Sequence, residues 1–153
     1  MKAGALAPDF ELPDQTGTPR RLTTMLADGP VVLFFYPAAQ TTGCTKESCH
    51  FRDMKAEYEK VGAQRVGISV DTVEKQKAFS DEHGFDYPLL SDAGGSIADA
   101  YGVKRGSLMG RLAPVKRQTF VIGTDGRIID IISSETKFDV HADQALLTLV
   151  KSA

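Results

Sequence analysis

The sequence predicts an α/β protein whose mixed central sheet is flanked by helices. Runs of β-branched and aromatic residues, of which 31–36 is the clearest, alternate with segments of helical pattern. Near the C-terminus, two further strands are joined by a turn signal at 124–126, which favours an antiparallel pair. The chain has 153 residues, 42 % hydrophobic and 25 % charged, the usual size and composition of one globular domain. We therefore expect a single domain covering residues 1–153.

The N-terminal part begins with a predicted β-hairpin formed by 10–12 and 20–22 around Gly17. Thr23 or Thr24 is expected to cap a short helix that ends near Gly29. The elements expected next are a buried strand at 31–36, a helix at 41–61 closed by Gly62, a buried strand at 65–70, a helix at 73–83 capped by Asp71 and ended by Gly84, a strand at 87–90 and a helix at 96–101.

The C-terminal part is expected to pair strands 118–122 and 127–133 and to end in an amphipathic helix at 139–151. The residues predicted to face inward from this helix are Val140, Ala145, Leu146, Leu149 and Val150. Alternating strands and helices followed by a hairpin and a helix fit a thioredoxin-like fold with a mixed central sheet and an N-terminal β-hairpin.

Both cysteines of the chain, Cys44 and Cys49, follow the strand at 31–36, and Pro37 marks the end of that strand. Residues 45–48 suit a first helical turn, so Cys44 is predicted at the junction between a central strand and a helix. Backbone N–H groups and the positive end of the helix dipole favour the thiolate at such a place. The position therefore predicts a reactive cysteine.

The spacing of Pro37, Thr41 and Cys44 is P-x-x-x-T-x-x-C, and Cys49 follows five positions later. This pattern resembles the active-site motif of the peroxiredoxins, and the second cysteine resembles their PrxQ/bacterioferritin-comigratory-protein subgroup. The likeness extends over essentially the whole chain. The other segments that carry it are A-P-D-F-E-L-P-D at 7–14, F-F-Y-P at 34–37, F-R-D at 51–53 and R-Q-T-F-V-I at 117–122.

The resemblance implies a thiol-dependent peroxidase in which Cys44 attacks peroxide and becomes a sulfenic acid. Thr41 would offer its hydroxyl to the bound peroxide, and Arg117 would hydrogen-bond both the sulfur and the peroxide. Pro37 would cover the site from water and deny it a competing N–H group. Glu47, one turn beyond Cys44, would orient the arginine. No metal or organic cofactor is implied.

By the same resemblance, Cys49 would attack the sulfenic acid and form an intramolecular disulfide with Cys44. Positions five apart on a helix lie about 7.5 Å apart along its axis and about 140° apart around it. Their Cα atoms are then roughly 8–9 Å apart, beyond the ~7 Å limit for a disulfide. We therefore expect the segment from 42 to about 51 to unwind at its start on oxidation. An external dithiol such as thioredoxin would reduce the bond, because the chain has no third cysteine.

The subgroup commonly has proline at the position of Thr42, and its replacement is expected to loosen the start of the helix. Other readings of these residues remain open. Cys44 could be a small buried hydrophobe. Cys49 could separately pack in the core, with an outside thiol resolving the sulfenic acid of Cys44. Thr41 could be an N-cap and Pro37 the punctuation of a strand, and Lys116 could replace Arg117 as the relevant cation. Alternative functions are a thioredoxin-like disulfide reductase and a peroxide-sensing module.

A net charge of −2 gives no case for binding nucleic acid or a membrane surface. Two cysteines beside His50 lack zinc spacing, and His83 and His141 have no paired ligand. No apolar run precedes Pro8, so we expect a cytoplasmic protein. A monomer is expected rather than a dimer.

A basic loop between 102 and 117 is expected to flank the active site. Three apolar residues of this loop, Leu108, Met109 and Leu112, are predicted to cover the site in part.

Overall fold

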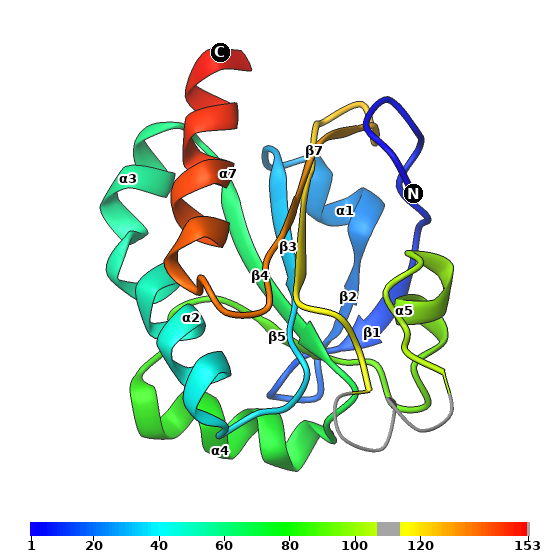
Figure 1. The fold of residues 1–153 in the computed structure, drawn as a ribbon, viewed down its shortest axis with the longest axis vertical. Coiled ribbons are helices and arrows are strands. Elements are labelled where there is room, and N and C mark those ends of the chain that lie inside the picture. The colour runs from blue at the N-terminus through cyan, green and yellow to red at the C-terminus, as the bar shows by residue number, and fades with distance from the viewer. Residues whose placement is uncertain (107–113, 153) are drawn as a thin grey trace.

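A computed structural model describes residues 1–106 and 114–152 of the chain. Its centre is a five-stranded mixed sheet in the order β5-β4-β3-β6-β7, with helices on both faces (Figure 1). A separate two-stranded sheet pairs β1 (Glu11–Pro13) with β2 (Pro19–Arg21) in antiparallel fashion. The predicted α/β fold with a mixed sheet and an N-terminal hairpin is confirmed.

The middle strand of the large sheet is β3 (Val31–Phe35), and all its residues are buried. It runs parallel to β4 (Gln64–Ser69) and antiparallel to β6 (Gln118–Ile122). The edges are β5 (Leu89–Ser91), parallel to β4, and β7 (Ile128–Ser133), antiparallel to β6. A strand covered on both faces has no solvated side, which explains why 31–36 reads as a continuous apolar run.

The helices divide between the two faces of the sheet (Figure 1). One face carries α2 (Thr42–Asp53), α3 (Lys55–Lys60), α4 (Val73–His83) and α7 (Asp139–Ser152). The other face carries α1 (Leu22–Leu26) and α5 (Ser96–Ala100). Each face of the sheet has its own hydrophobic core, and successive β3 side chains point alternately into one core and the other, as the geometry of a strand requires. No helix among the described residues is long and apolar enough to cross a membrane.

One aromatic pair packs helix α2 against the sheet. The rings of Phe51 on α2 and Phe34 on β3 stack with centroids 4.1 Å apart and planes 9° from parallel, and both side chains are fully buried. At the same end, Tyr58 of α3 donates its hydroxyl to the carbonyl of Ala142 on α7 at 2.8 Å. The helices on this face are therefore fastened to the sheet and to each other.

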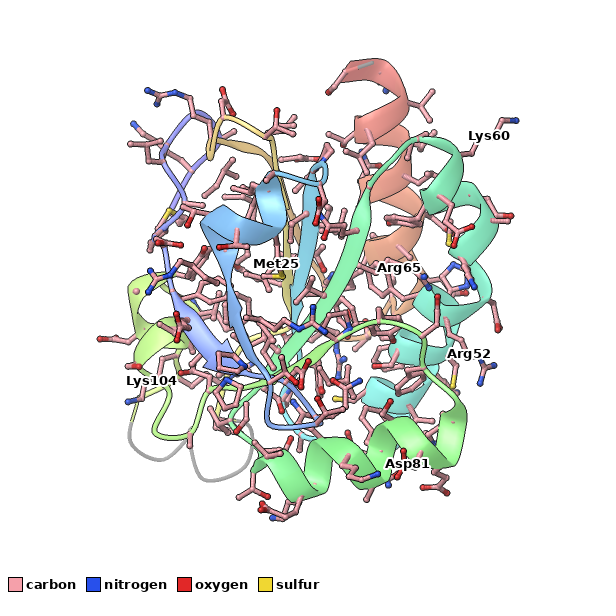
Figure 2. All side chains as sticks on the ribbon, turned by 180° about the vertical axis from the view of Figure 1, so that it is seen from behind. Met25, Arg52, Lys60, Arg65, Asp81 and Lys104 are labelled. Atoms are coloured by element: carbon pink, nitrogen blue, oxygen red, sulfur yellow. The ribbon has the colours of Figure 1, made fainter. Side chains whose placement is uncertain are left out.

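The predicted helix at 41–61 is wrong in one respect, since it breaks at Met54 into α2 and α3. Met54 has φ −96° and ψ 19°, outside the helical range. The reason lies in β4, whose Arg65 (labelled in Figure 2) donates from Nη1 to the carbonyls of Phe51 at 2.9 Å and Arg52 at 3.4 Å. A side chain distant in sequence thus satisfies the last carbonyls of α2, which lets the helix end there.

Two predicted helix caps are also wrong. Helix α1 begins at Leu22 with no side-chain cap, and Thr23 instead donates its N–H to Asp9 Oδ1 at 3.2 Å. The cap of α4 is Thr72, one residue after the predicted Asp71, and its hydroxyl accepts from the N–H of Lys75 at 3.3 Å. Asp71 instead accepts a hydrogen bond from the N–H of Ala39, in the loop before α2. The end of α4 at Gly84, with φ 64°, is as predicted.

The inward face of α7 differs from the predicted one. Val140 and Val150 are 37 % and 54 % exposed, whereas Ala145 and Leu149 are buried as expected. The position next to Val140 faces inward, because His141 bonds to β6 and to the chain before α7. His141 thus lies on the inward face beside Ala142, Ala145 and Leu149, a position that its polar side chain did not indicate.

We expect Phe51→Ala to lower the free energy of unfolding by about 3–5 kcal/mol, because it removes a buried ring and leaves a cavity under α2. Urea unfolding followed by circular dichroism measures the loss. Val150→Ala is the control, with an expected change within about 0.5 kcal/mol for an exposed position. Equal losses for the two variants would contradict the packing described for α2 and α7.

Candidate active site

Cys44 lies in the first turn of α2, just beyond the end of β3. Its side chain is fully buried, and the thiol is free. The first backbone bond of the helix runs from Thr45 N–H to the carbonyl of Thr41 at 2.9 Å. The N–H groups of residues 42–44 therefore have no helical acceptor and form the positive end of the helix. The predicted junction of strand and helix is present.

Arg117 reaches the sulfur from the chain just before β6. The antiparallel register pairs Phe35, the last residue of β3, with Gln118, which brings Arg117 next to the segment that leads into α2. Arg117 Nη2 donates to Cys44 Sγ at 3.3 Å, and Nη1 donates to Glu47 Oε1 at 2.8 Å. The guanidinium group is almost fully buried, whereas the neighbouring Lys116 is exposed. The geometry thus selects Arg117 over Lys116.

Phe138, in the chain just before α7, covers the guanidinium group. Its ring centroid lies 4.9 Å from Arg117 Cζ, a cation–π distance. A Cβ atom on Gly43 would come within 2.6 Å of this ring, so glycine is needed there for close approach. The sequence reasoning missed Phe138, since nothing in the local pattern around it indicates its neighbour.

Glu47 is fully buried on the other side of Arg117. Burial raises the pKa of its carboxyl to about 8, and the pairing with Arg117 offsets only part of that effect. The predicted contact between Glu47 and the arginine is present in the structure. Its second oxygen, Oε2, has no hydrogen-bond partner among the described residues.

Thr41 and Pro37 lie in the short loop between β3 and α2. Thr41 occupies the N-cap position with extended backbone, but its hydroxyl makes no capping bond and donates to the carbonyl of Ala38 at 2.8 Å. Its side chain is exposed, and Pro37 is half-buried. Gln40 has φ 67°, a left-handed conformation that non-glycine residues seldom adopt. The loop is thus tightly turned, and the roles predicted for Thr41 and Pro37 stay predictions.

A hydrogen-bond network that the sequence reasoning did not find holds this loop in place. Asp71 Oδ2 accepts from the N–H of Ala39 at 2.7 Å and from the hydroxyl of Ser69 at 2.6 Å. Gln76 donates to that hydroxyl at 2.9 Å and accepts from the Tyr36 hydroxyl at 2.5 Å. The network joins β3, β4 and α4 to the loop and fixes where α2 begins.

Cys49 lies on the same unbroken helix as Cys44, half-buried and free. Burial raises the pKa of its thiol. Helical geometry keeps the two Cα atoms roughly 8–9 Å apart, so no disulfide forms while α2 is intact. The second half of α2 is tied down, because Tyr87 donates to the carbonyl of Ser48 at 2.6 Å and His50 bonds to Asp143 at 2.7 Å.

The described residues contain no group of three or more His, Cys, Asp or Glu side chains that could hold a metal ion. The predicted cover formed by Leu108, Met109 and Leu112 lies outside the described residues.

Comparison with known proteins agrees with this geometry. The model of the AhpC/TSA family matches residues 3–131. A putative peroxiredoxin of Mycobacterium tuberculosis (strain ATCC 25618 / H37Rv) is 64 % identical over 149 residues, covering 97 % of this chain and 96 % of that protein. The chloroplastic peroxiredoxin Q of Arabidopsis thaliana is 41 % identical over 146 residues, covering 95 % of this chain and 66 % of that protein.

Solved structures extend the likeness to three dimensions. The crystal structure of peroxidoxin BcpB from Mycobacterium tuberculosis has a TM-score of 0.95 and 63 % identity, covering 100 % of this chain and 99 % of that one. A mutant of Xanthomonas campestris peroxiredoxin Q has a TM-score of 0.85 and 31 % identity, covering 94 % and 92 %. The chain therefore belongs to the AhpC/TSA family and is a thiol-dependent peroxidase, a peroxiredoxin of the PrxQ/bacterioferritin-comigratory-protein subgroup.

Proposed function

We propose that the chain reduces hydrogen peroxide and small organic hydroperoxides through a sulfenic acid on Cys44. The observation that carries this proposal is the 3.3 Å contact between Arg117 Nη2 and Cys44 Sγ, at the N-terminus of a helix and closed off from solvent. A cation and unpaired N–H groups beside one sulfur favour its thiolate. The bacterioferritin comigratory protein of Xanthomonas campestris, 30 % identical to this chain, has alkyl peroxide reduction activity, which supports the organic substrates.

In the first step the Cys44 thiolate attacks one peroxide oxygen. An S–O bond forms and the O–O bond breaks, and the second oxygen leaves as hydroxide or alkoxide and takes a proton from solvent. Negative charge moves from sulfur to this oxygen, so donors already in place stabilise it without reorganisation. Arg117 and the N–H groups at the start of α2 are those donors, and the Thr41 hydroxyl lies on the same loop. Pro37 adds cover without adding an N–H group.

In the second step Cys49 attacks the Cys44 sulfenic acid. An S–S bond forms between the two residues, and the sulfenic hydroxyl leaves as water once protonated. The first turns of α2 unwind to allow this, since the intact helix keeps the sulfurs apart. Thr42, unlike a proline at this position, does not fix the backbone and leaves the helix start free to open. An external dithiol such as thioredoxin then reduces the bond by thiol–disulfide exchange.

The cycle needs neither metal nor organic cofactor, and we place it in a cytoplasmic monomer. The rival disulfide-reductase function fits the geometry less well. A reductase needs an accessible thiol with its partner sulfur in reach, whereas Cys44 is fully buried and Cys49 lies more than a turn away. A peroxide sensor would share the first step but would pass the Cys44 state to a partner instead of turning over.

Cys44→Ser should abolish peroxide consumption, because serine has no thiolate to attack the O–O bond. Stopped-flow peroxide consumption with stoichiometric protein measures this step. Cys49→Ser is the matched control, since it removes the other sulfur and should keep the first turnover. Retained turnover in Cys44→Ser would refute the assignment of the nucleophile.

Cys49→Ser should consume one equivalent of peroxide and stop at a sulfenic acid, because no second sulfur remains to resolve it. Intact-protein mass spectrometry with a dimedone trap detects this species. Wild-type protein should lose two mass units instead, the signature of a disulfide. Unchanged steady-state cycling of the variant with thioredoxin would show that an outside thiol resolves Cys44.

Arg117→Ala should slow the first step by about 10²–10³-fold, the usual effect of removing one charge-stabilising donor. Lys116→Ala is the matched control, because it removes the same charge from the adjacent exposed position. Similar rates for the two variants would exclude the proposed role of Arg117.

A further inference from the structure

A group of buried polar side chains lies next to Arg117, beginning one turn along α2 from Cys44. It consists of Glu47 on α2, His141 on α7 and Thr119 on β6, and none of the three has any exposed surface. Glu47 Oε2 lies 3.6 Å from His141 Nδ1 and has no hydrogen-bond partner among the described residues. An unpartnered oxygen in such a site is costly unless its charge is neutralised, so its protonation state needs an explanation.

The hydrogen bonds of His141 fix its tautomer. Nε2 lies 2.8 Å from the carbonyl oxygen of Ser134, which can only accept, so Nε2 carries a proton. Burial lowers the pKa of His141, which favours the neutral ring. In the neutral ring Nδ1 is then an acceptor, and the Thr119 hydroxyl donates to it at 2.7 Å. His141 therefore presents a lone pair, not an N–H group, toward Glu47 Oε2.

The other charges around Glu47 do not neutralise this oxygen. Arg117 Nη1 bonds to Oε1, and its Nη2 is directed at Cys44. Glu135 is a further acid near this group, but its carboxylate accepts from Arg105 Nη2 and from the backbone N–H of Arg117, each at 2.9 Å. One guanidinium thus faces two acids in the same pocket, Cys44 and Glu47.

We propose that Glu47 is a neutral carboxylic acid while Cys44 is a thiolate, and that His141 is the positioning residue that holds Glu47 in this form. This inference rests on the proposed role of Cys44. An ionised Glu47 would face the Nδ1 lone pair and compete for Arg117, whereas a protonated Oε2 is attracted to Nδ1 and leaves the guanidinium charge to the sulfur. When Cys44 becomes a sulfenic acid, Glu47 loses its proton to solvent and becomes the counter-ion of Arg117.

The strongly raised pKa of Glu47, about 8, agrees with this geometry. The sign of the coupling follows from electrostatics, because a neighbouring anion disfavours a second one. Removing the Cys44 charge should therefore lower the pKa of Glu47. At pH above about 8, Glu47 in the reduced protein should ionise and draw Arg117 away from the thiolate.

Infrared spectroscopy of the reduced protein tests the inference, because a carboxylic acid and a carboxylate have separate C=O bands. We expect an acid band at pH 7 that disappears in Glu47→Gln and persists in Glu135→Gln. The band should be lost on peroxide oxidation, and in Cys44→Ser it should titrate away at lower pH than in wild-type protein. An absent Glu47 band at pH 7, or a titration unchanged by Cys44→Ser, would overturn the proposal.

Two further variants separate a specific role of His141 from a structural one. His141→Phe removes the acceptor of the carboxyl proton, so the acid band should move to higher frequency. Thr119→Val keeps the side-chain shape and removes the competing donor to Nδ1, so the band should move the opposite way. A general loosening of the fold would not give opposite shifts. Unshifted bands in both variants would overturn the role of His141.

Measuring the first-turnover rate with stoichiometric hydrogen peroxide distinguishes a failure of this inference from a failure of the proposed function. The wild-type rate should fall above about pH 8 as Glu47 ionises, and Glu47→Gln should lose this alkaline fall. A protein that reacts rapidly but lacks the acid band would overturn the proton on Glu47. A protein that shows the band but ignores peroxide would refute the role of Cys44 instead.

Discussion

The structure of the site depends on the position of one buried guanidinium group. Arg117 donates to Cys44 and to Glu47 through its two terminal nitrogens, and the ring of Phe138 covers it. A cation closed off from water stabilises an anion far more than an exposed one does, because the surrounding dielectric is low. Burying the guanidinium group also carries a large desolvation penalty, which well-placed hydrogen-bond acceptors must offset. The site therefore has to supply acceptors on both sides of the arginine.

The sheet order provides this geometry. Strand β6 pairs with β3, so the residue before β6 lies beside the point where the chain leaves β3 for α2. The network on Asp71 then fixes the loop between them, and the stacked Phe34 and Phe51 hold α2 against the sheet. A sulfur on one element and a cation on another, 73 positions apart, thus meet at 3.3 Å.

The same helix meets two opposing requirements. Its intact first turn places Cys44 in contact with Arg117, while the proposed disulfide with Cys49 would require that turn to open. The hydrogen bonds from Tyr87 to the carbonyl of Ser48 and between His50 and Asp143 hold the second half of α2. Opening is therefore easier at the start of the helix, where the backbone has few partners, than at its end.

The α/β class, the mixed sheet and the neighbourhood of Cys44 follow from the sequence by itself, because strand periodicity, turn residues and the spacing from Pro37 to Cys44 are local properties. The tertiary structure decided the rest. The break at Met54 depends on a side chain from β4, and the inward position of His141 depends on its bonds to Thr119 and Ser134. The cover by Phe138 and the burial of Glu47 between Arg117 and His141 likewise depend on residues far away in the chain. Burial and hydrogen bonding between distant segments are set by the packed fold, and no local pattern records them.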